Sequence, residues 1–326
     1  MTSAPKLHQD DKDSNYSATG IHNDMIQDKY RTLTYCKAIE NNAASFKDKV
    51  VLDVGSGTGI LSLFAARSGA KKVYAVECTP IGYTSEEIIS ANHFENIITV
   101  VHGRLEEVEI PEKVDIIISE WMGYALYFEV MLPSVIFARN KYLNPNGALL
   151  PSRAKLFMSG MEDVEYRCTQ IDFWDNVYGF DFSAMKRKAL SEPVVDTCEK
   201  WQLMTNTATL HEINIHECDE DACFFKSNFD LTCNLNQSMT AFAIWFDVYF
   251  EDFPSKHTLS TSPLKKSTHW QQTMLYLKDP LDVKKNDHVK GNIEFQENPN
   301  DGGGLIILLE YQLNDGPVIK QDFDFR

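Results

Sequence analysis

The pattern of hydrophobic and polar positions changes near residue 150, which predicts two differently built parts. Before that point, short apolar runs alternate with helix-forming segments. The runs at 50–54, 73–76, 97–101 and 114–119 are nearly continuous in apolar residues, as is typical of parallel strands buried on both faces. Strands that alternate with helices predict a doubly wound, Rossmann-like α/β domain over residues 20–150.

After residue 151 the apolar runs become β-rich and are separated by polar turns. The segments 209–215, 229–233, 241–250, 272–277 and 305–313 predict an antiparallel sandwich or barrel over 151–326. Residues 163–200 interrupt this pattern with aromatic, helix-like sequence, and exposed aromatic residues of this kind favour an interface. Residues 1–19 are polar and charged, which predicts a disordered tail.

Helical spacing of apolar residues begins after Gly20 and continues to Ile39. Within it, Asp24, Asp28 and Arg31 lie three to four positions apart, which places them on one helix face. The default interpretation of such charges is a set of solvated ion pairs.

A glycine-rich turn follows the first predicted strand. Asp53 lies within that strand, and Gly55, Gly57 and Gly59 follow in a G-x-G-x-G pattern before a helical segment. A dinucleotide site uses G-x-G-x-x-G, so the tighter spacing argues against a nicotinamide-dependent dehydrogenase and suits a ligand without phosphates. The next strand ends on Glu77, and a carboxylate at that place can accept both hydroxyls of a ribose.

Two acids mark the fourth predicted strand and the loop after it. Glu120 ends the strand, and Glu129 follows beyond Gly123, which permits a turn. Together they can clamp a cation, and a guanidinium suits such a clamp because its planar fork of N–H donors meets carboxylates bidentately. Alternatively, Glu120 caps the next helix and Glu129 is a solvated helix residue. Spacing alone leaves both interpretations open.

Composition narrows the class of protein. The 326 residues are 43% hydrophobic and carry a net charge of −16, with no apolar run of 18 residues and no signal-peptide pattern, so we expect an intracellular, soluble protein. The negative charge favours a basic peptide over nucleic acid as partner, although many proteins are acidic for solubility alone. The seven scattered cysteines predict reduced thiols. His211 and His216 are five positions apart, unlike the zinc motif H-E-x-x-H, and alternation predicts a strand there.

Several motifs taken together resemble the type I, asymmetric-dimethylating protein arginine N-methyltransferases over residues 20–326. They are G-I-H-N-D-M-I-Q-D-K-Y-R, V-L-D-V-G-S-G-T-G-I-L, S-E-W-M-G-Y-A-L-Y-F-E-V-M-L, F-W-D-N-V-Y-G-F-D and S-T-H-W at 267–270. The resemblance implies S-adenosyl-L-methionine as cofactor and arginine-rich proteins as substrates, such as histone tails and RNA-binding proteins. It also implies a homodimer formed through the aromatic arm at 163–200, no direct nucleic-acid or membrane binding, and a cytoplasmic and nuclear location.

The resemblance also assigns roles to residues. It implies Glu120 and Glu129 as the guanidinium clamp and Asp28 and His269 as the pair that receives the proton. Implied cofactor contacts, some of them already singled out by pattern, are His22, Arg31, Asp53, Gly55, Gly57, Glu77, Glu106 and Met131. Arg31 is also implied as a brace for Glu120. Met25 and Met131 match residues that shape access for the second methylation.

The sequence departs from the family pattern in several places. The aromatic motif of the cofactor lid is reduced to Tyr16, with Lys12 and Asp13 at the other aromatic positions. The usual H-E-E-M is H-N-D-M at 22–25, Ser267 replaces the aromatic residue before T-H-W, and 301–304 reads D-G-G-G instead of N-N-R-D. The missing lid aromatics motivate an alternative function: a weakly active or inactive paralogue that serves as a dimer partner or scaffold.

Overall fold

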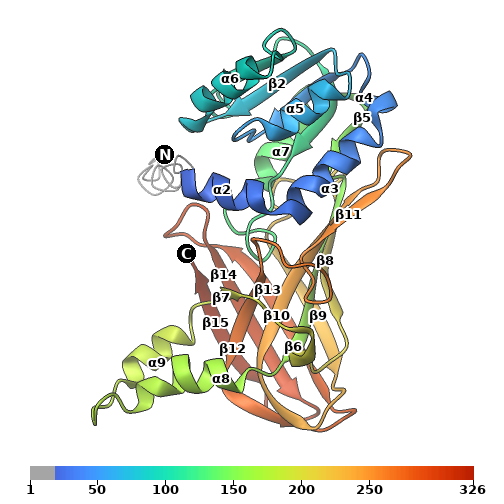
Figure 1. Ribbon diagram of the computed structural model, residues 1–326. Helices are drawn as coiled ribbons and strands as arrows, with labels where there is room; N and C mark the ends of the chain where they lie inside the picture. The colour runs from blue at the N-terminus through green and yellow to red at the C-terminus, as the bar shows by residue number, and fades with distance from the viewer. Residues whose placement is uncertain (1–18) are drawn as a thin grey trace, which may run out of the picture.

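The computed structural model describes residues 19–326, so the predicted tail and the departures at Lys12 and Asp13 lie outside the described residues. The N-terminal half contains a five-stranded parallel sheet in the order β3-β2-β1-β4-β5 (Figure 1). Its strands are β1 (Val50–Val54), β2 (Lys72–Glu77), β3 (Ile98–His102), β4 (Val114–Ser119) and β5 (Leu143–Leu150). Every residue of β1 is buried, which explains why all of them except Asp53 are apolar.

Helices cover this sheet and precede it. They are α2 (Thr19–Gln27), α3 (Lys29–Glu40), α4 (Ala43–Phe46), α5 (Ile60–Arg67), α6 (Ile81–Ala91) and α7 (Leu132–Tyr142). The helical pattern after Gly20 is therefore split in two at Asp28. The Asp28 side chain caps α3 by accepting a hydrogen bond from the backbone N–H of Arg31, so the predicted single face of acids and Arg31 does not form.

The C-terminal half is built from two antiparallel sheets that curl around a shared core (Figure 1). One has the order β7-β12-β10-β6-β8, with β11 paired to β10, and the other has the order β15-β14-β13-β9. The strands are β6 (Arg153–Met161), β7 (Val194–Asp196), β8 (Ala208–Asn214), β9 (Phe225–Thr232), β10 (Gln237–Phe250), β11 (His257–Ser260), β12 (Gln272–Val283), β13 (His288–Glu297), β14 (Leu305–Leu313) and β15 (Ile319–Phe325). The predicted antiparallel β domain is confirmed.

An arm of short helices leaves the β domain between β6 and β7 and projects from it (Figure 1). It contains α8 (Val164–Tyr166), the π-helical turn η1 (Arg167–Ile171), the 3₁₀ turn η2 (Asp172–Asp175) and α9 (Ser183–Ala189), and the 3₁₀ turn η3 (Lys200–Gln202) follows β7. Tyr178 and Phe180 near its tip are 95% and 69% exposed. Its root is fixed by the buried Arg167, which donates to the carbonyls of Leu277 and Lys278 on β12. This is the segment that the sequence predicted as an interface.

The structure also bears on the cysteines and on membrane-spanning helices. All seven cysteines are free thiols, as predicted. Among residues 19–326, no helix is long and apolar enough to cross a lipid bilayer.

Candidate functional site

A cavity of about 380 Å³ lies at the carboxyl ends of β1, β2 and β4, where doubly wound sheets bind ligands. Its walls come from α2, the glycine turn, the loop after β4 and the segment around His269 of the β domain. A volume of this size accommodates a nucleoside-sized ligand. The two halves of the chain therefore meet at one pocket.

The glycine turn adopts the backbone that its sequence requires. Gly55, Gly57 and Gly59 all have positive φ, at 70°, 54° and 80°. Gly59 is the N-cap of α5 in the left-handed region, which a residue with a Cβ adopts only at a cost. The N–H groups of Gly55 and Ser56 donate to the carbonyl of Val76, and that of Gly59 donates to the carbonyl of Ser56, which fixes the shape of the turn beside the cavity.

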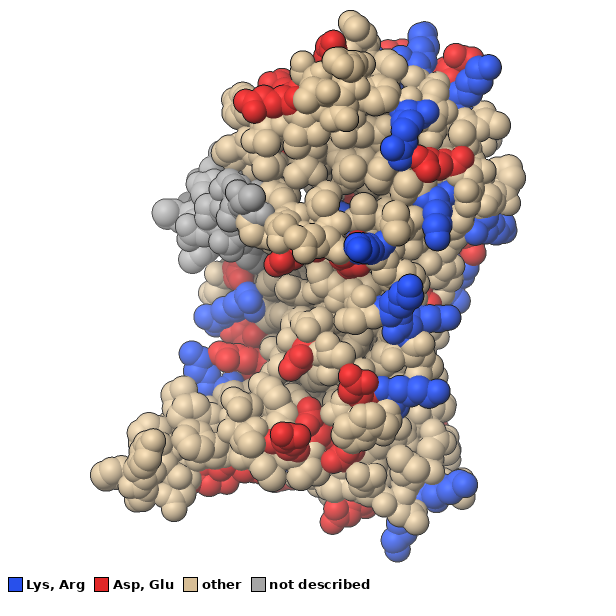
Figure 2. Space-filling model, viewed as in Figure 1, with Lys and Arg blue, Asp and Glu red and all other residues tan. Residues whose placement is uncertain are grey.

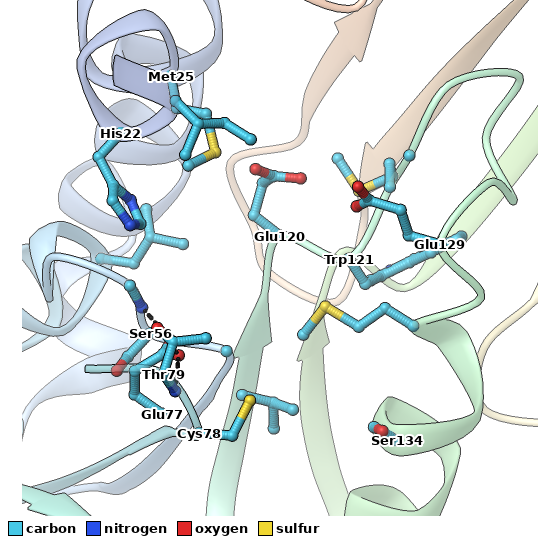
Figure 3. A pocket seen from close by; sticks show the side chains of 18 of the residues that line it. His22, Met25, Ser56, Glu77, Cys78, Thr79, Glu120, Trp121, Glu129 and Ser134 are labelled. Carbon is cyan, nitrogen blue, oxygen red and sulfur yellow. Dashed lines mark hydrogen bonds between the residues drawn. The ribbon is translucent and has the colours of Figure 1, made fainter. Parts of the chain in front are cut away.

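Glu77, at the end of β2, is held by three donors. Its Oε2 accepts from the backbone N–H of Gly57 at 2.8 Å, and its Oε1 accepts from the N–H and the hydroxyl of Thr79 at 2.8 and 2.7 Å. The carboxylate is only 7% exposed and lines the cavity (Figure 3). Oε1 already accepts two hydrogen bonds, but Oε2 accepts one and keeps a lone pair for a ligand hydroxyl, which fits the ribose contact expected of this residue.

Of three further residues expected to contact the cofactor, two line the cavity and one does not. His22 and Glu106 line the cavity, and Glu106 accepts a hydrogen bond of 2.6 Å from Ser134. Asp53 does not line it: the carboxyl is fully buried in β1 and accepts from Ser62 at 2.7 Å. Burial raises the pKa of Asp53 to about 7. Its place fits support of the glycine turn from below better than direct contact with a ligand.

Glu120 is bound to a buried cation. Its Oε2 accepts from Nη2 and Nε of Arg31 at 2.8 and 3.1 Å, and both side chains are less than one-tenth exposed. The implied brace is therefore present. Because both donors meet one oxygen, Oε1 remains available on the cavity side, and Figure 3 shows the Glu120 carboxyl turned toward that of Glu129.

Glu129 lies in a tight loop between β4 and α7. Gly123 is required there for close approach rather than for a positive φ, because a Cβ at this position would lie 1.8 Å from the carbonyl oxygen of Phe128. Glu129 itself has a φ of 77°, and its N–H donates to the carbonyl of Gly303 at 2.8 Å. Gly303 belongs to the D-G-G-G stretch at 301–304, so that departure from the family pattern touches the site directly.

Asp28 and His269 form a pair across the two halves. Oδ2 of Asp28 lies 2.9 Å from Nδ1 of His269 and also accepts from its backbone N–H at 2.9 Å. Burial raises the pKa of Asp28, but the hydrogen bonds from His269 and Arg31 outweigh burial and leave that pKa below its ordinary value. Asp28 is therefore a carboxylate at neutral pH, able to stabilise a proton on the imidazole.

Met25 and Met131 line the same cavity from α2 and from the residue that precedes α7. Asp24, which replaces a glutamate of the H-E-E-M pattern, lines it too. The apolar side chains of Met25 and Met131 narrow the cavity, and that of Met131 lies against the glycine turn, where it would meet a Cβ added at Gly55.

Three supporting residues were not predicted. Thr79 fixes Glu77, as described above, and the buried hydroxyl of Tyr35 donates to the carbonyl of Ser119 at 2.9 Å. The indole N–H of Trp270 donates to the carbonyl of Met122 at 2.8 Å. Tyr35 carried a usable signal, because a tyrosine in an apolar helical stripe needs a partner for its hydroxyl when buried. The partners of Tyr35 and Trp270 are 84 and 148 residues away, so no local pattern could identify them.

The strand predicted at 211–216 is confirmed only as far as Asn214, where β8 ends, and His216 lies in the turn that follows. His211 lies in β8, where Ile213 is buried. Among the described residues no group of three or more His, Cys, Asp or Glu side chains could hold a metal ion.

A doubly wound sheet with G-x-G-x-G at its first strand, a pinned acid at its second and a nucleoside-sized cavity defines the class of S-adenosylmethionine-dependent methyltransferases. Two family models match the chain: the arginine methyltransferase oligomerization subdomain over residues 152–316, and the ribosomal protein L11 methyltransferase over 31–137. The second covers part of the cofactor domain and indicates the same class.

Relatives narrow the assignment. The chain is 43% identical to protein arginine N-methyltransferase 8-B of Danio rerio over 95% of this chain and 75% of that protein. It is 44% identical to protein arginine N-methyltransferase 1 of Caenorhabditis elegans over 91% and 86%. A solved structure of the Trypanosoma brucei PRMT1 enzyme-prozyme heterotetrameric complex with AdoHcy matches with a TM-score of 0.93 and 40% identity, over 96% of this chain and all of that one. The Arabidopsis thaliana protein arginine methyltransferase 10 matches with a TM-score of 0.86 at 26% identity over 96% of this chain and all of that one.

The chain belongs to the protein arginine N-methyltransferase family. It is a type I, S-adenosylmethionine-dependent enzyme of this family, and its C-terminal half contains the family's oligomerization subdomain.

Proposed function

We propose that the enzyme methylates arginines of basic, Gly/Arg-rich proteins and yields mono- and asymmetric dimethylarginine. The observation that carries the proposal is the pair of carboxyls, Glu120 and Glu129, that face each other across the cavity (Figure 3). A guanidinium placed between them can donate hydrogen bonds to both carboxylates, and their negative charges stabilise its positive charge.

Different residues would bind the cofactor and orient the substrate. Glu77, Gly55 and Gly57 would hold the ribose and the amino-acid part of S-adenosylmethionine, with His22, Arg31, Glu106 and Met131 around it. When bound, this cofactor supplies an electrophilic methyl group on a sulfonium. Glu120 and Glu129 orient one guanidino nitrogen toward that group, so that positioning and electrostatics supply most of the acceleration.

A proton must leave the nitrogen when the new N–C bond forms. His269 lines the same cavity, and its ring is held by Asp28, so the imidazole is placed to accept this proton and the carboxylate to stabilise the imidazolium. Met25 and Met131 narrow the cavity and would set how easily a monomethylated arginine is accepted again.

Charge supports a basic substrate. The net charge is −16, which attracts cationic peptides and repels nucleic-acid backbones. On the face shown in Figure 2, acidic and basic side chains are interspersed, and the described residues form no continuous basic surface there. We therefore propose histone tails and RNA-binding proteins as the substrate type, and a cytoplasmic and nuclear location where such substrates occur.

A labelled-donor assay tests this function. The full-length protein is incubated with labelled S-adenosylmethionine and a Gly/Arg-rich peptide, and the product is hydrolysed and analysed by mass spectrometry. We expect monomethyl- and asymmetric dimethylarginine. Absence of transfer, or symmetric dimethylarginine, would refute the proposal. The peptide with every arginine replaced by lysine is the matched control and should remain unlabelled.

We propose further that the arm at 163–200 docks on the cofactor domain of a second copy and forms a homodimer. Its exposed aromatic residues, Tyr178 and Phe180 among them, support this, since an isolated chain would leave them in water. Replacement of both by serine should convert the dimer to a monomer in analytical ultracentrifugation, whereas a dimer that persists would refute the docking.

A second candidate function is that of a weakly active partner subunit. Two observations favour it: the missing lid aromatics at Lys12 and Asp13, and the relative from Trypanosoma brucei, which forms an enzyme-prozyme heterotetramer. The two functions differ in cofactor affinity. Calorimetry with S-adenosylhomocysteine should show tight binding for the enzyme and little or none for a scaffold.

A further inference from the structure

Among the contacts between the Glu129 loop and the β domain is a hydrogen bond made by Tyr127, which lies two positions before Glu129. Tyr127 is 1% exposed, and its hydroxyl lies 3.0 Å from Nδ1 of His211 on β8. This hydrogen bond joins residues 84 positions apart and connects the β4–α7 loop to the β domain. His211 is thus not a metal ligand but the partner of a buried phenol.

A β-bulge directs His211 to this place. β8 carries one extra residue, Leu210, against β6. On one side of the bulge Thr209 is exposed and Leu210 is buried, whereas on the other side the partly buried His211 and the buried Ile213 share the inward face. A regular strand with Leu210 inward would point His211 to solvent, because side chains alternate between faces. The extra residue of the bulge reverses the alternation of faces after Leu210, so the imidazole of His211 points inward, toward Tyr127.

Aromatic stacking holds the imidazole in that orientation. The ring of His211 lies 4.2 Å from that of Phe225 on β9, with an interplanar angle of 17°. Phe225 in turn stacks on Phe295 of β13 at 4.9 Å. Burial lowers the pKa of His211 and raises that of Tyr127 well above its ordinary value, so both groups are neutral near pH 7. A neutral hydrogen bond between rigid rings is a stable anchor point.

The loop needs such an anchor because its backbone is strained. Ala125, Leu126, Glu129 and Val130 all have positive φ, at 47°, 70°, 77° and 51°. Residues with a Cβ keep such conformations only when surrounding contacts hold them. The contacts that hold the loop include the Gly123–Leu126 bridge, the bond from Glu129 to the carbonyl of Gly303, the bond from Trp270 to the carbonyl of Met122, the stacking of Phe128 on Phe325, and the Tyr127 hydroxyl.

We infer that Tyr127 and His211 are positioning residues that hold the loop in the geometry in which Glu129 can orient the substrate guanidinium. This inference rests on the proposed role of Glu129. Its consequence is specific: loss of the bond between the phenol and the imidazole should lower turnover and leave cofactor binding intact, because the groups around Glu77 lie on other elements.

Three variants test the inference, assayed for kcat and KM with a Gly/Arg-rich peptide and for S-adenosylhomocysteine affinity by calorimetry. Tyr127→Phe removes only the hydroxyl, and His211→Leu removes its partner. Each should lower kcat about tenfold, a typical effect of losing one buried hydrogen bond that acts in the transition state. His211→Asn retains a donor and an acceptor close to the position of Nδ1 and should recover most of kcat. All three should bind S-adenosylhomocysteine as the wild type does.

Tyr74→Phe is the matched control, because it removes another tyrosine hydroxyl bond, of 2.9 Å to Glu112, far from the loop. Its kcat should equal that of the wild type. A wild-type kcat in Tyr127→Phe, an equal loss in Tyr74→Phe, or a His211→Asn variant no better than His211→Leu would each overturn the inference. Should Tyr127→Phe not fold, the comparison of the two His211 variants decides. An inactive wild type would instead refute the proposed function itself.

Discussion

Replacement of Glu120 by glutamine should destabilise the protein, whereas the same change at Glu129 should not. The two acids face one cavity but differ in partners. Glu120 receives two hydrogen bonds from Arg31, at 2.8 and 3.1 Å, and both side chains are less than one-tenth exposed. Glu120→Gln keeps the shape of the side chain but leaves the buried guanidinium without a compensating charge.

The magnitude follows from these contacts. Hydrogen bonds to charged groups contribute about 1.5–3 kcal/mol each, and neutral ones about 0.5–1.5 kcal/mol, so the change weakens each of two bonds by roughly 1 kcal/mol. The unpaired charge of Arg31 adds to this, since removal of one partner of a buried pair costs about 3–5 kcal/mol. Because glutamine retains an acceptor, we expect a total loss of about 3 kcal/mol in the free energy of unfolding, between these limits.

Urea unfolding of the full-length variants, at one protein concentration and without cofactor, measures this loss. Glu129→Gln is the matched control: it is an identical chemical change in the same cavity, and it removes one of two facing like charges, so its stability should stay close to that of the wild type. Both variants should lose methyl transfer. Equal stability of Glu120→Gln and the wild type would refute the argument, as would an equal loss in Glu129→Gln.

Three further predictions concern other contacts of the site. Thr79→Val removes the hydroxyl bond to Glu77 and should weaken S-adenosylhomocysteine binding about tenfold in calorimetry, whereas Thr84→Val, at an exposed position of α6, should not. Gly123→Ala places a Cβ against the Phe128 carbonyl, and we expect at least about a hundredfold loss of kcat with cofactor affinity retained; normal kcat would contradict the close approach. The lowered pKa of Asp28 means that its carboxylate stabilises the folded state above its ordinary pKa, and that this contribution is lost as pH falls through the lowered value. The stability difference between wild type and Asp28→Asn, measured by urea unfolding, should therefore be present at pH 5 and shrink below about pH 4, and a difference that does not shrink there would exclude the paired carboxylate.

The sequence predicted those elements whose own residues determine them. β1 and β4 are nearly continuous apolar runs, each interrupted by one aspartate, and their predicted bounds are correct, whereas β2 extends one residue further at each end than predicted. β5, in contrast, reads L-N-P-N-G-A-L-L, and proline, glycine and asparagine disfavour a strand. It is a strand because β4 provides a pairing partner, which is a contact between distant segments. The sequence analysis also did not predict β13. Gly291 interrupts the alternation of the buried residues Val289, Ile293 and Phe295, and the strand is stabilised by pairing with β14 and β9.

The helical segment is divided at Asp28, which an interpretation based only on the spacing of apolar residues does not predict. The apolar spacing of residues 21–39 fits one helix, but Asp is a strong N-cap, and its carboxyl gains more as the cap of α3 than as a solvated residue inside a longer helix. The facing acids at 120 and 129 could be proposed from the sequence because a strand end and a loop define their places. The contacts that hold these acids in place could not be proposed from the sequence. The backbone N–H of Glu129, for example, donates to the carbonyl of Gly303, and no sequence pattern marks a backbone carbonyl as an acceptor.

The first turn of α3 connects the two halves of the active site. Asp28 and Arg31 lie three positions apart: the first binds His269 of the β domain, and the second binds Glu120 at the end of β4. A single helical turn therefore places His269, the proposed proton acceptor, relative to Glu120, one of the two acids proposed to bind the guanidinium, and the hydrogen bond from Trp270 to the carbonyl of Met122 joins the same two regions directly. The cofactor groups around Glu77 do not depend on this turn, since their donors come from Gly57 and Thr79. It follows that displacement of α3 should impair methyl transfer more than cofactor binding, because Arg31 is the one proposed cofactor contact on this helix, whereas both links described here start from it.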